Sequence, residues 1–187
     1  HWAGISVFAT GGIGGVHRGY PFDESADLME LSQTPVAVVC AGAKAILDLP
    51  LTVEVLESRG VAVIGFQTDE LPAFYSRQSG LPVDVRVDTA DEAASIIRAA
   101  RKMGLHGGQL ITVPVPVDSE WPAEEAQAII NQAVADAQQL GITGQSGTPF
   151  LLDRVNNLSA GRSKEANIAI LLNNAQVAAE IASALAR

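Results

Sequence analysis

The chain has 187 residues, of which 48% are hydrophobic and 18% charged, and its formal net charge at pH 7 is −9. This length predicts one domain, and the composition supplies a hydrophobic core and excludes a disordered chain. The negative charge excludes a nucleic-acid-binding surface and argues against binding to anionic membranes. Any phosphate ligand would therefore have to be held locally, by backbone amides, a basic side chain or a metal ion.

The single cysteine, Cys40, lies in an apolar segment and cannot form an internal disulfide, so we interpret it as a small buried hydrophobe. No uninterrupted apolar stretch reaches the roughly 18 residues of a membrane span, and no signal peptide is visible. A cytoplasmic protein is expected. Because the sequence lacks an initiator Met and starts one step before a strand, we also expect a fragment or a processed product.

Short apolar segments alternate with longer amphipathic ones along the chain. Several of the short segments are continuously apolar, as in a parallel sheet that is covered on both faces. We predict strands at Ile5 to Thr10, Val36 to Ala41, Val61 to Gln67, Val83 to Val87 and Leu110 to Val113.

Helices are predicted between these strands from capping residues and glycine stops. A further short helix is expected at residues 45–47. The longer predicted helices are Ser25 to Gln33, Leu51 to Arg59, Glu92 to Met103, Pro122 to Leu140, and Ser163 to Ala184 with Ser163 as its cap. The alternation predicts an α/β fold, a three-layer α/β/α sandwich around a mostly parallel or mixed sheet.

Lys44 follows the strand from Val36 to Ala41 and is one of three lysines in the chain. A lysine at the tip of an apolar strand is a candidate Schiff-base nucleophile, because desolvation favours the neutral and reactive amine. The alternative is a lysine that extends to solvent at a strand end or neutralises a nearby acid. Lys102 and Lys164 lie in polar helical sequence and are expected to be solvated.

The segment from Thr10 to Gly19 contains five glycines and follows the first strand. Its free amides can cradle a phosphate or carboxylate, although the spacing is neither that of a Walker A loop nor that of the dinucleotide fingerprint. A tight structural turn explains the glycines equally well. His17 and Arg18 in this segment favour an anion-binding or proton-transfer loop slightly.

Asp23, Glu24 and Asp27 lie within five residues at a predicted helix start. Three acids so close together can hold a divalent cation through oxygen ligands and water. Acids also collect at helix N-termini for capping and dipole reasons, and that alternative stays open.

Three asparagines, Asn167, Asn173 and Asn174, lie on the last predicted helix, which is otherwise apolar. A buried amide there can orient a substrate or can satisfy a neighbouring backbone group, and the second interpretation is favoured for the residues in isolation. Farther back, the aromatic pair Phe74 and Tyr75 is expected to pack, and we assign it no role.

Taken together in chain order, these segments resemble the pseudouridine-5′-phosphate glycosidase family, also called the indigoidine synthase A-like family. The resemblance covers essentially the whole chain, and the ordered series is specific where no single piece would be. The matching stretches are 8–19, 25–28, 38–44, 72–75, 148–152, 167–169 and 173–175.

The resemblance implies an enzyme that reversibly cleaves the C–C glycosidic bond of pseudouridine 5′-phosphate to uracil and ribose 5-phosphate. Such enzymes open the ribose ring and hold C1′ as an imine on a lysine, and the imine acts as the electron sink for breaking the C–C bond. By motif match that lysine is Lys44.

The resemblance also implies roles for other residues and for partners of the protein. The aspartate that binds Mn²⁺ corresponds to Asp23, and the substrate-contacting stretch corresponds to Ser25, Ala26 and Asp27. Asp27 would orient the uracil or assist proton movement, and Asn167 would lie near the base and sugar. Thr10 and His17 would line the pocket, and a homotrimer is expected.

The chain departs from the family pattern at Glu24, where the family usually has Ile, and at Pro50, which replaces a common Gly. Residues 1–187 would form a single α/β domain, the C-terminal part of a larger catalytic domain whose N-terminal segment supplies a glutamate proton donor and a phosphate-binding lysine. The alternative function is therefore a catalytically incomplete fragment that binds sugar phosphates. A changed substrate within the same enzyme class is a third possibility.

Overall fold

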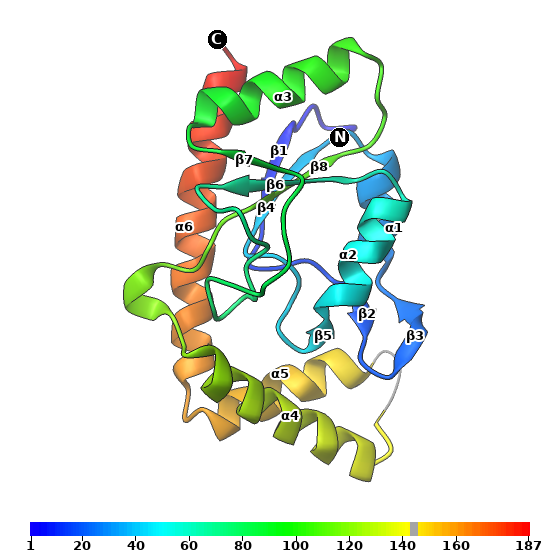
Figure 1. The fold of residues 1–187 in the computed structure, drawn as a ribbon, viewed down its shortest axis with the longest axis vertical. Helices are drawn as coiled ribbons and strands as arrows, with labels where there is room; N and C mark the ends of the chain where they lie inside the picture. Colours follow the sequence, from blue (N-terminus) through cyan, green and yellow to red (C-terminus); the bar gives the residue numbers. More distant parts are fainter. Residues whose placement is uncertain (143–145) are drawn as a thin grey trace.

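A five-stranded parallel sheet forms the centre of the computed structural model, which describes residues 1–142 and 146–187 (Figure 1). The strand order is β1-β4-β8-β6-β7, and β4 pairs with β1 on one side and β8 on the other. The five strands are β1 Val7–Ala9, β4 Ala37–Cys40, β6 Ala62–Phe66, β7 Val85–Val87 and β8 Gln109–Thr112. All five predicted strands are confirmed, and their shared direction is the predicted one.

Helices cover both faces of this sheet, so the predicted three-layer α/β/α sandwich is confirmed. On one face, Ala37 and Val39 of β4 pack in a cluster with Ile97 and Ile181, which come from α3 (Ala90–Lys102) and α6 (Arg162–Leu185). On the other face, Cys40 packs in a cluster with residues of α1 (Ala26–Gln33) and α2 (Leu49–Ser58). Alternate residues of a strand point to opposite faces, which is why neighbouring residues of β4 belong to different clusters.

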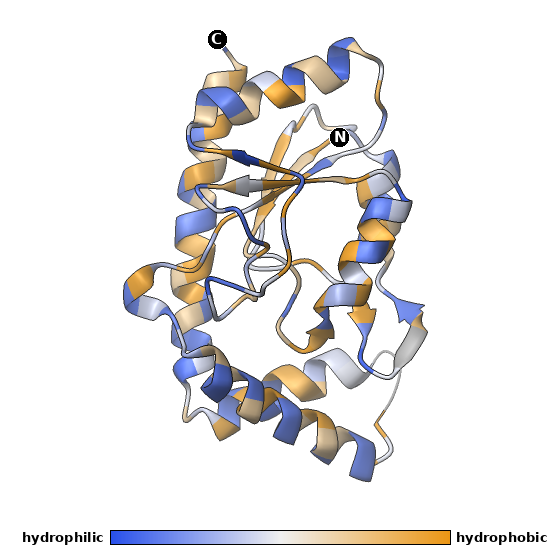
Figure 2. Cartoon of the chain, viewed as in Figure 1, coloured by the Kyte–Doolittle hydropathy of each residue, from blue (hydrophilic) through white to orange (hydrophobic). Residues whose placement is uncertain are grey.

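The capping signals in the sequence set two of the helix starts. Ser25 caps α1 and accepts a hydrogen bond from the amide of Asp27 at 3.2 Å. Thr89 and Glu92 form a reciprocal capping box at the start of α3, as the spacing predicts. Figure 2 shows β1 and β4 as largely hydrophobic, in keeping with their place between two helical layers.

A second, antiparallel sheet of β3, β2 and β5 lies beside the first and was not predicted. Its strands are β2 Val16–His17, β3 Tyr20–Glu24 and β5 Leu47–Asp48. Two predictions are wrong here. Residues 45–47 form a turn that leads into β5 and no helix, because Leu47 pairs with His17. Asp23 and Glu24 belong to β3 and not to a helix start, because Glu24 pairs with Val16.

The region after the sheet consists of η1 (Val117–Ser119), α4 (Ala123–Gln139) and α5 (Gly147–Leu158), with α4 and α5 packed together. The sequence predicted α4 and missed α5. It also placed the start of α6 wrongly. Gly161 is the N-cap with φ 89°, and Ser163 lies inside the first turn, where its amide donates to the Ser159 hydroxyl at 3.2 Å.

Within the described ranges, α6 has the length and apolarity of a membrane-spanning helix. It lies against β1, β4, α3 and α5, and it buries Asn174 at its centre. One face of α6 thus packs on the sheet, while Ile168, Leu171 and Leu172 on the same helix are exposed.

Candidate functional site

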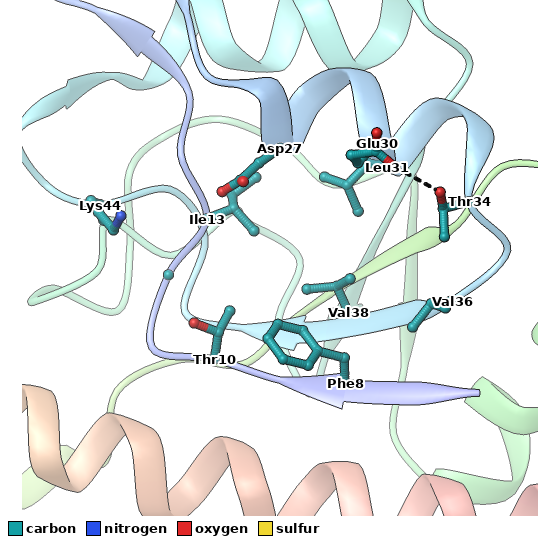
Figure 3. A pocket seen from close by; sticks show the side chains of 11 residues that line it. Phe8, Thr10, Ile13, Asp27, Glu30, Leu31, Thr34, Val36, Val38 and Lys44 are labelled. Atoms are coloured by element: carbon teal, nitrogen blue, oxygen red, sulfur yellow. Dashed lines mark hydrogen bonds between the residues drawn. The ribbon is translucent and has the colours of Figure 1, made fainter. Parts of the chain in front are cut away.

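A cavity of about 360 Å³ lies between α1 and the face of the sheet formed by β1 and β4 (Figure 3). Lys44, Thr10 and Asp27 line it together, although they are far apart in the sequence. Thr10 follows the carboxyl end of β1 and Lys44 follows that of β4. The carboxyl ends of neighbouring parallel strands share one edge of the sheet, which is where α/β proteins commonly bind ligands.

One face of α1, which carries both polar and apolar side chains, forms one wall of the cavity. Asp27, Glu30, Leu31 and Thr34 line it at the spacing i, i+3, i+4 and i+7, which places them on one face of the helix. Thr34 donates from its hydroxyl to the Glu30 carboxylate at 2.9 Å, and Figure 3 shows this pair at the end of the cavity away from Lys44.

The floor of the cavity is apolar. It is formed by Phe8 of β1 together with Val36 and Val38, and Phe8 remains 54% exposed. Figure 3 shows these side chains below α1, with Asp27 and Lys44 toward one end. The cavity thus joins an apolar surface to two carboxylates, Asp27 and Glu30, and one amine, Lys44.

The backbone around Lys44 is held by a short extension of the parallel pairing between β1 and β4. Ala41 donates its amide to the carbonyl of Gly11 at 2.8 Å, Ile13 donates to Gly42 at 3.0 Å, and Lys44 donates to Ile13 at 3.0 Å. The Lys44 side chain is half-buried at the cavity. The position of the lysine is therefore tied to that of the glycine segment.

Asp27 uses one carboxylate oxygen to fix that glycine segment. The amide of Gly14 donates to Oδ2 of Asp27 at 2.7 Å. A Cβ on Gly14 would lie 2.1 Å from the Ser25 hydroxyl, so glycine is required for this close approach. One amide of the segment is thus bonded to a carboxylate of the chain itself, and the expected cradle for a phosphate or carboxylate ligand stays a prediction. Ser25 and Ala26 lie beside Asp27 at the start of α1 and outside the cavity lining.

His17 and Asp23 lie away from Lys44, at a second and smaller cavity of about 70 Å³ beside α4 and α5. Their side chains approach each other, with 3.7 Å between Nδ1 of His17 and Oδ2 of Asp23. Thr10 and His17 thus line different cavities of this chain, and the expected contact of His17 with the substrate stays a prediction. The two residues lie apart because β2 carries His17 away from the first sheet into the antiparallel one.

Arg18 is occupied by the backbone of the chain. Its Nε donates to the carbonyl of Leu47 at 3.0 Å, and its Nη2 donates to that of Ala45 at 3.0 Å. Burial lowers the pKa of the Arg18 guanidinium from its usual value, and the nearby Asp48 opposes this effect. Arg18 thus braces the turn between Lys44 and β5 and is not placed as an anion ligand of the first cavity.

Two of the three asparagines of α6, Asn174 and Asn167, lie against the glycine segment. Asn174 is 1% exposed and donates from Nδ2 to the carbonyl of Thr10 at 2.8 Å. Asn167 is half-buried, and its Oδ1 would lie 2.8 Å from a Cβ on Gly11. Asn173 donates to the carbonyl of Pro114 at 3.4 Å. The backbone-satisfying interpretation therefore holds for Asn174 and Asn173, while Asn167 approaches the segment that carries Thr10.

Sequence reasoning missed the apolar floor and the middle of the α1 wall. The helical spacing from Asp27 to Thr34 could have revealed the wall. Phe8 and Val38 had no such signal, because β1 and β4 are continuously apolar and do not alternate.

Cys40 is the last residue of β4, four residues before Lys44, and is completely buried, as predicted. Desolvation raises the pKa of its thiol to about 12. We therefore expect the thiol to resist alkylation by iodoacetamide in the native protein and to react once the protein is unfolded, because the thiolate is the nucleophile.

The same shift predicts a loss of stability at alkaline pH. Between the usual thiol pKa of 9.0 and about 12, the unfolded state loses a proton that the folded state keeps, so the free energy of unfolding falls as pH rises. The substitution Cys40→Ala should flatten this alkaline slope in urea titrations. An unchanged slope together with fast native alkylation would contradict the assignment of Cys40 as a desolvated core thiol.

Comparison with known proteins gives one consistent family. Residues 1–184 match the family model described as indigoidine synthase A like protein. A pseudouridine-5′-phosphate glycosidase of Paracoccus denitrificans is 56% identical over 188 residues, covering 100% of this chain and 62% of that protein. A second protein of that name, from Geobacillus kaustophilus, is 58% identical, and the alignment covers 98% of this chain and 62% of that protein.

Two solved structures share the fold. The prealnumycin C-glycosynthase AlnA, in complex with ribulose 5-phosphate, has a TM-score of 0.91 and 39% identity, over 98% of this chain and 61% of that one. An indigoidine synthase A-like protein of Thermotoga maritima has a TM-score of 0.91 and 37% identity, and the match covers 100% of this chain and 61% of that one. The chain thus spans about three fifths of the length of these relatives. It belongs to the indigoidine synthase A-like family.

Proposed function

We propose that the protein containing this chain cleaves the C–C glycosidic bond of pseudouridine 5′-phosphate reversibly, through an imine on Lys44. The observation that carries the proposal is the cavity in which the Lys44 amine and the Asp27 carboxylate meet an apolar floor. Relatives at 56% and 58% identity bear the name of this activity, which supports the choice of substrate.

The chemistry is simplest in the direction of synthesis. The neutral Lys44 amine adds to the aldehyde carbon of open-chain ribose 5-phosphate, and loss of water gives the imine. Carbon 5 of uracil then adds to the imine carbon and later loses its proton, and the ring oxygen displaces the amine. Cleavage follows the same steps in reverse, so a proton must reach carbon 5 as the C–C bond breaks.

The surrounding residues support these steps by their positions. Among the described residues, the Asp27 carboxylate is hydrogen-bonded through one oxygen, to the Gly14 amide, so its other oxygen can orient the uracil or move a proton. Thr10 presents its hydroxyl to the same cavity, and Asn167 approaches Gly11 from α6. Phe8 and Val38 form an apolar floor, and a flat base can stack on such a hydrophobic surface.

The proposed activity predicts release of uracil when the natural full-length protein is mixed with pseudouridine 5′-phosphate. Chromatography of the products should show uracil and ribose 5-phosphate in equal amounts. Borohydride added with ribose 5-phosphate should fix the sugar on Lys44, because hydride reduces the imine to a stable secondary amine. A folded protein that neither releases uracil nor takes up the label would refute the proposal and leave the sugar-phosphate-binding fragment as the remaining interpretation.

A second candidate reaction is the formation of a C-glycoside on another aromatic acceptor. It is favoured by the fold and 39% identity shared with a C-glycosynthase solved with ribulose 5-phosphate. The higher identity to the glycosidases ranks it second. Competition between uracil and other ring acceptors for the trapped imine distinguishes the two.

We further propose that Asp23 provides a ligand for one Mn²⁺ ion. Among the residues that the structure describes, no group of three His, Cys, Asp or Glu side chains could enclose a metal. A half-exposed carboxylate with His17 beside it nevertheless fits a hard cation that keeps most of its waters. Such an ion would supply electrostatic stabilisation of negative charge on the substrate.

The substitution Asp23→Ala should weaken Mn²⁺ binding by about tenfold or more, because the ion loses its charged protein ligand. Electron paramagnetic resonance of free Mn²⁺ measures this binding without reference to activity. Asp118→Ala, which removes an exposed carboxylate from η1, serves as the matched control and should leave the titration unchanged. An Asp23→Ala protein that binds Mn²⁺ normally would place the ion elsewhere.

A homotrimer in the cytoplasm completes the proposal. Exposed apolar residues on α6, Ile168, Leu171 and Leu172, offer a surface for contact between copies. Light scattering of the purified full-length protein tests the number of subunits.

A further inference from the structure

The turn from Pro72 to Ser76 packs against the backbone that positions Lys44. A Cβ on Gly12 would lie 2.6 Å from Cε2 of Phe74, so the aromatic ring rests directly on the glycine backbone. A Cβ on Gly42 would lie 2.5 Å from the carbonyl oxygen of Pro72. One turn therefore touches both segments at the edge of the cavity, the one that carries Thr10 and the one that leads to Lys44.

Phe74 reaches this position through an unusual backbone conformation. Its φ is 65°, in the left-handed region that a bulky residue rarely adopts. The side chain is 5% exposed and makes an edge-to-face contact with Tyr75 at 4.8 Å between ring centroids. Strained conformations persist where the surroundings enforce them, and they gather at functional sites.

The surroundings of Phe74 do enforce it. Tyr75 stacks on Trp121 at 4.6 Å, and Arg162 lies 4.9 Å above the Trp121 ring. The Ser76 hydroxyl donates to the carbonyl of Trp121 at 2.9 Å, and the Trp121 amide donates to the carbonyl of Tyr75 at 2.9 Å. The turn is thereby fastened to the segment before α4 and to the start of α6, and its ring is fixed against Gly12.

We infer that Phe74 is a positioning residue for Lys44. The path runs from the Phe74 ring to Gly12, then through the hydrogen bond from the Lys44 amide to the carbonyl of Ile13. Phe74 itself lies outside the cavity lining, so it acts on the lysine through the backbone and does not touch the sugar. The inference rests on the proposed imine chemistry, because only a reacting amine needs so exact a placement.

The test is the rate at which borohydride traps ribose 5-phosphate on Lys44 in the full-length protein. In that reaction amine and aldehyde lose water to form the imine, and hydride with a proton from water gives the secondary amine. Phe74→Ala should slow trapping at saturating sugar by about 10- to 100-fold, since a displacement of about 1 Å can cost that much. The half-saturating sugar concentration should change far less, because Phe74 does not line the cavity.

Two further variants separate positioning from stability. Phe74→Gly also removes the ring but relieves the left-handed strain, so it should melt at a higher temperature than Phe74→Ala and trap just as slowly. Phe74→Leu restores apolar contact with Gly12 and should recover part of the rate. Phe66→Ala is the matched control, since Phe66 is 6% exposed in the cluster on the opposite face of the sheet.

The trapping rates of the variants decide whether Phe74 positions Lys44. If Phe74→Ala and Phe66→Ala trap sugar at equal rates per folded molecule, Phe74 is a structural core residue and the inference is wrong. If Phe74→Ala does not fold, the rates of Phe74→Leu and Phe74→Gly against Phe66→Ala decide in the same way. If the unsubstituted protein takes up no label, the proposed imine function fails first, and the positioning role fails with it.

Discussion

Replacing Lys44 with alanine is expected to abolish uracil release and borohydride trapping, by about 10³-fold or more, while the protein stays folded. The amine is the only atom group at the cavity that we assign to covalent bond formation. Among the described residues, the Lys44 side chain makes no ion pair, and it is half-buried at the cavity edge. Its loss should therefore change the free energy of unfolding by no more than about 1 kcal/mol.

Two controls sharpen this prediction. Lys102→Ala removes an exposed lysine from α3 and should leave both rates unchanged. Lys44→Arg keeps a cation of similar reach but offers a guanidinium that stays protonated, so it should be as inactive as the alanine variant. Peptide mapping of the trapped protein identifies the modified residue. Uracil release that survives in Lys44→Ala would rule out the imine mechanism.

The strands and most helices could be predicted because their signals are local. β4 is continuously apolar, and α3 carries both its capping box and a glycine after its last turn, Gly104. Such segments contain the information for their own structure. The parallel arrangement followed from the alternation of strand and helix along the chain.

The antiparallel sheet could not be predicted in the same way. β2 and β5 have two residues each, too short for a periodic pattern, and they form because Val16 and His17 pair with residues some thirty positions later. That pairing is a tertiary contact. It overrides the helical appearance of residues 45–47, and the pairing of β2 with β3 likewise moves Asp23 from a supposed helix start into a strand.

The candidate site was predictable at its centre and not at its edges. Lys44 and Thr10 each follow an apolar strand, and Asp27 begins a capped helix, so their meeting at one edge of the sheet follows from topology. Phe8 was hidden, because an exposed aromatic in a strand looks like any core residue in sequence. The contact of Phe74 with Gly12 was hidden for a different reason, since a left-handed phenylalanine has no sequence signal.

Replacing Gly42 with alanine is expected to destabilise the protein strongly and to impair the site. Gly42 has φ 82°, and an added Cβ would approach the carbonyl oxygen of Pro72 to 2.5 Å. The left-handed conformation costs an alanine about 1–2 kcal/mol. The contact with a backbone oxygen cannot be relieved by rotating a side chain, and overpacking of this kind costs about 1–3 kcal/mol more. Urea titration should therefore show a loss of about 2–5 kcal/mol in the free energy of unfolding.

Gly60→Ala provides the matched comparison for this prediction. Gly60 has φ 67°, directly after α2, and a Cβ added there would have nothing within 4 Å, so alanine at this position carries the conformational cost alone. The difference between the two variants isolates the contact with Pro72. Because Gly42 lies two residues before Lys44, that contact should also slow imine trapping in Gly42→Ala and not in Gly60→Ala. If Gly42→Ala and Gly60→Ala lose equal free energy of unfolding and trap sugar at equal rates, the turn at Pro72 shifts without cost. The contact of this turn with Gly42 would then not hold the lysine segment in place.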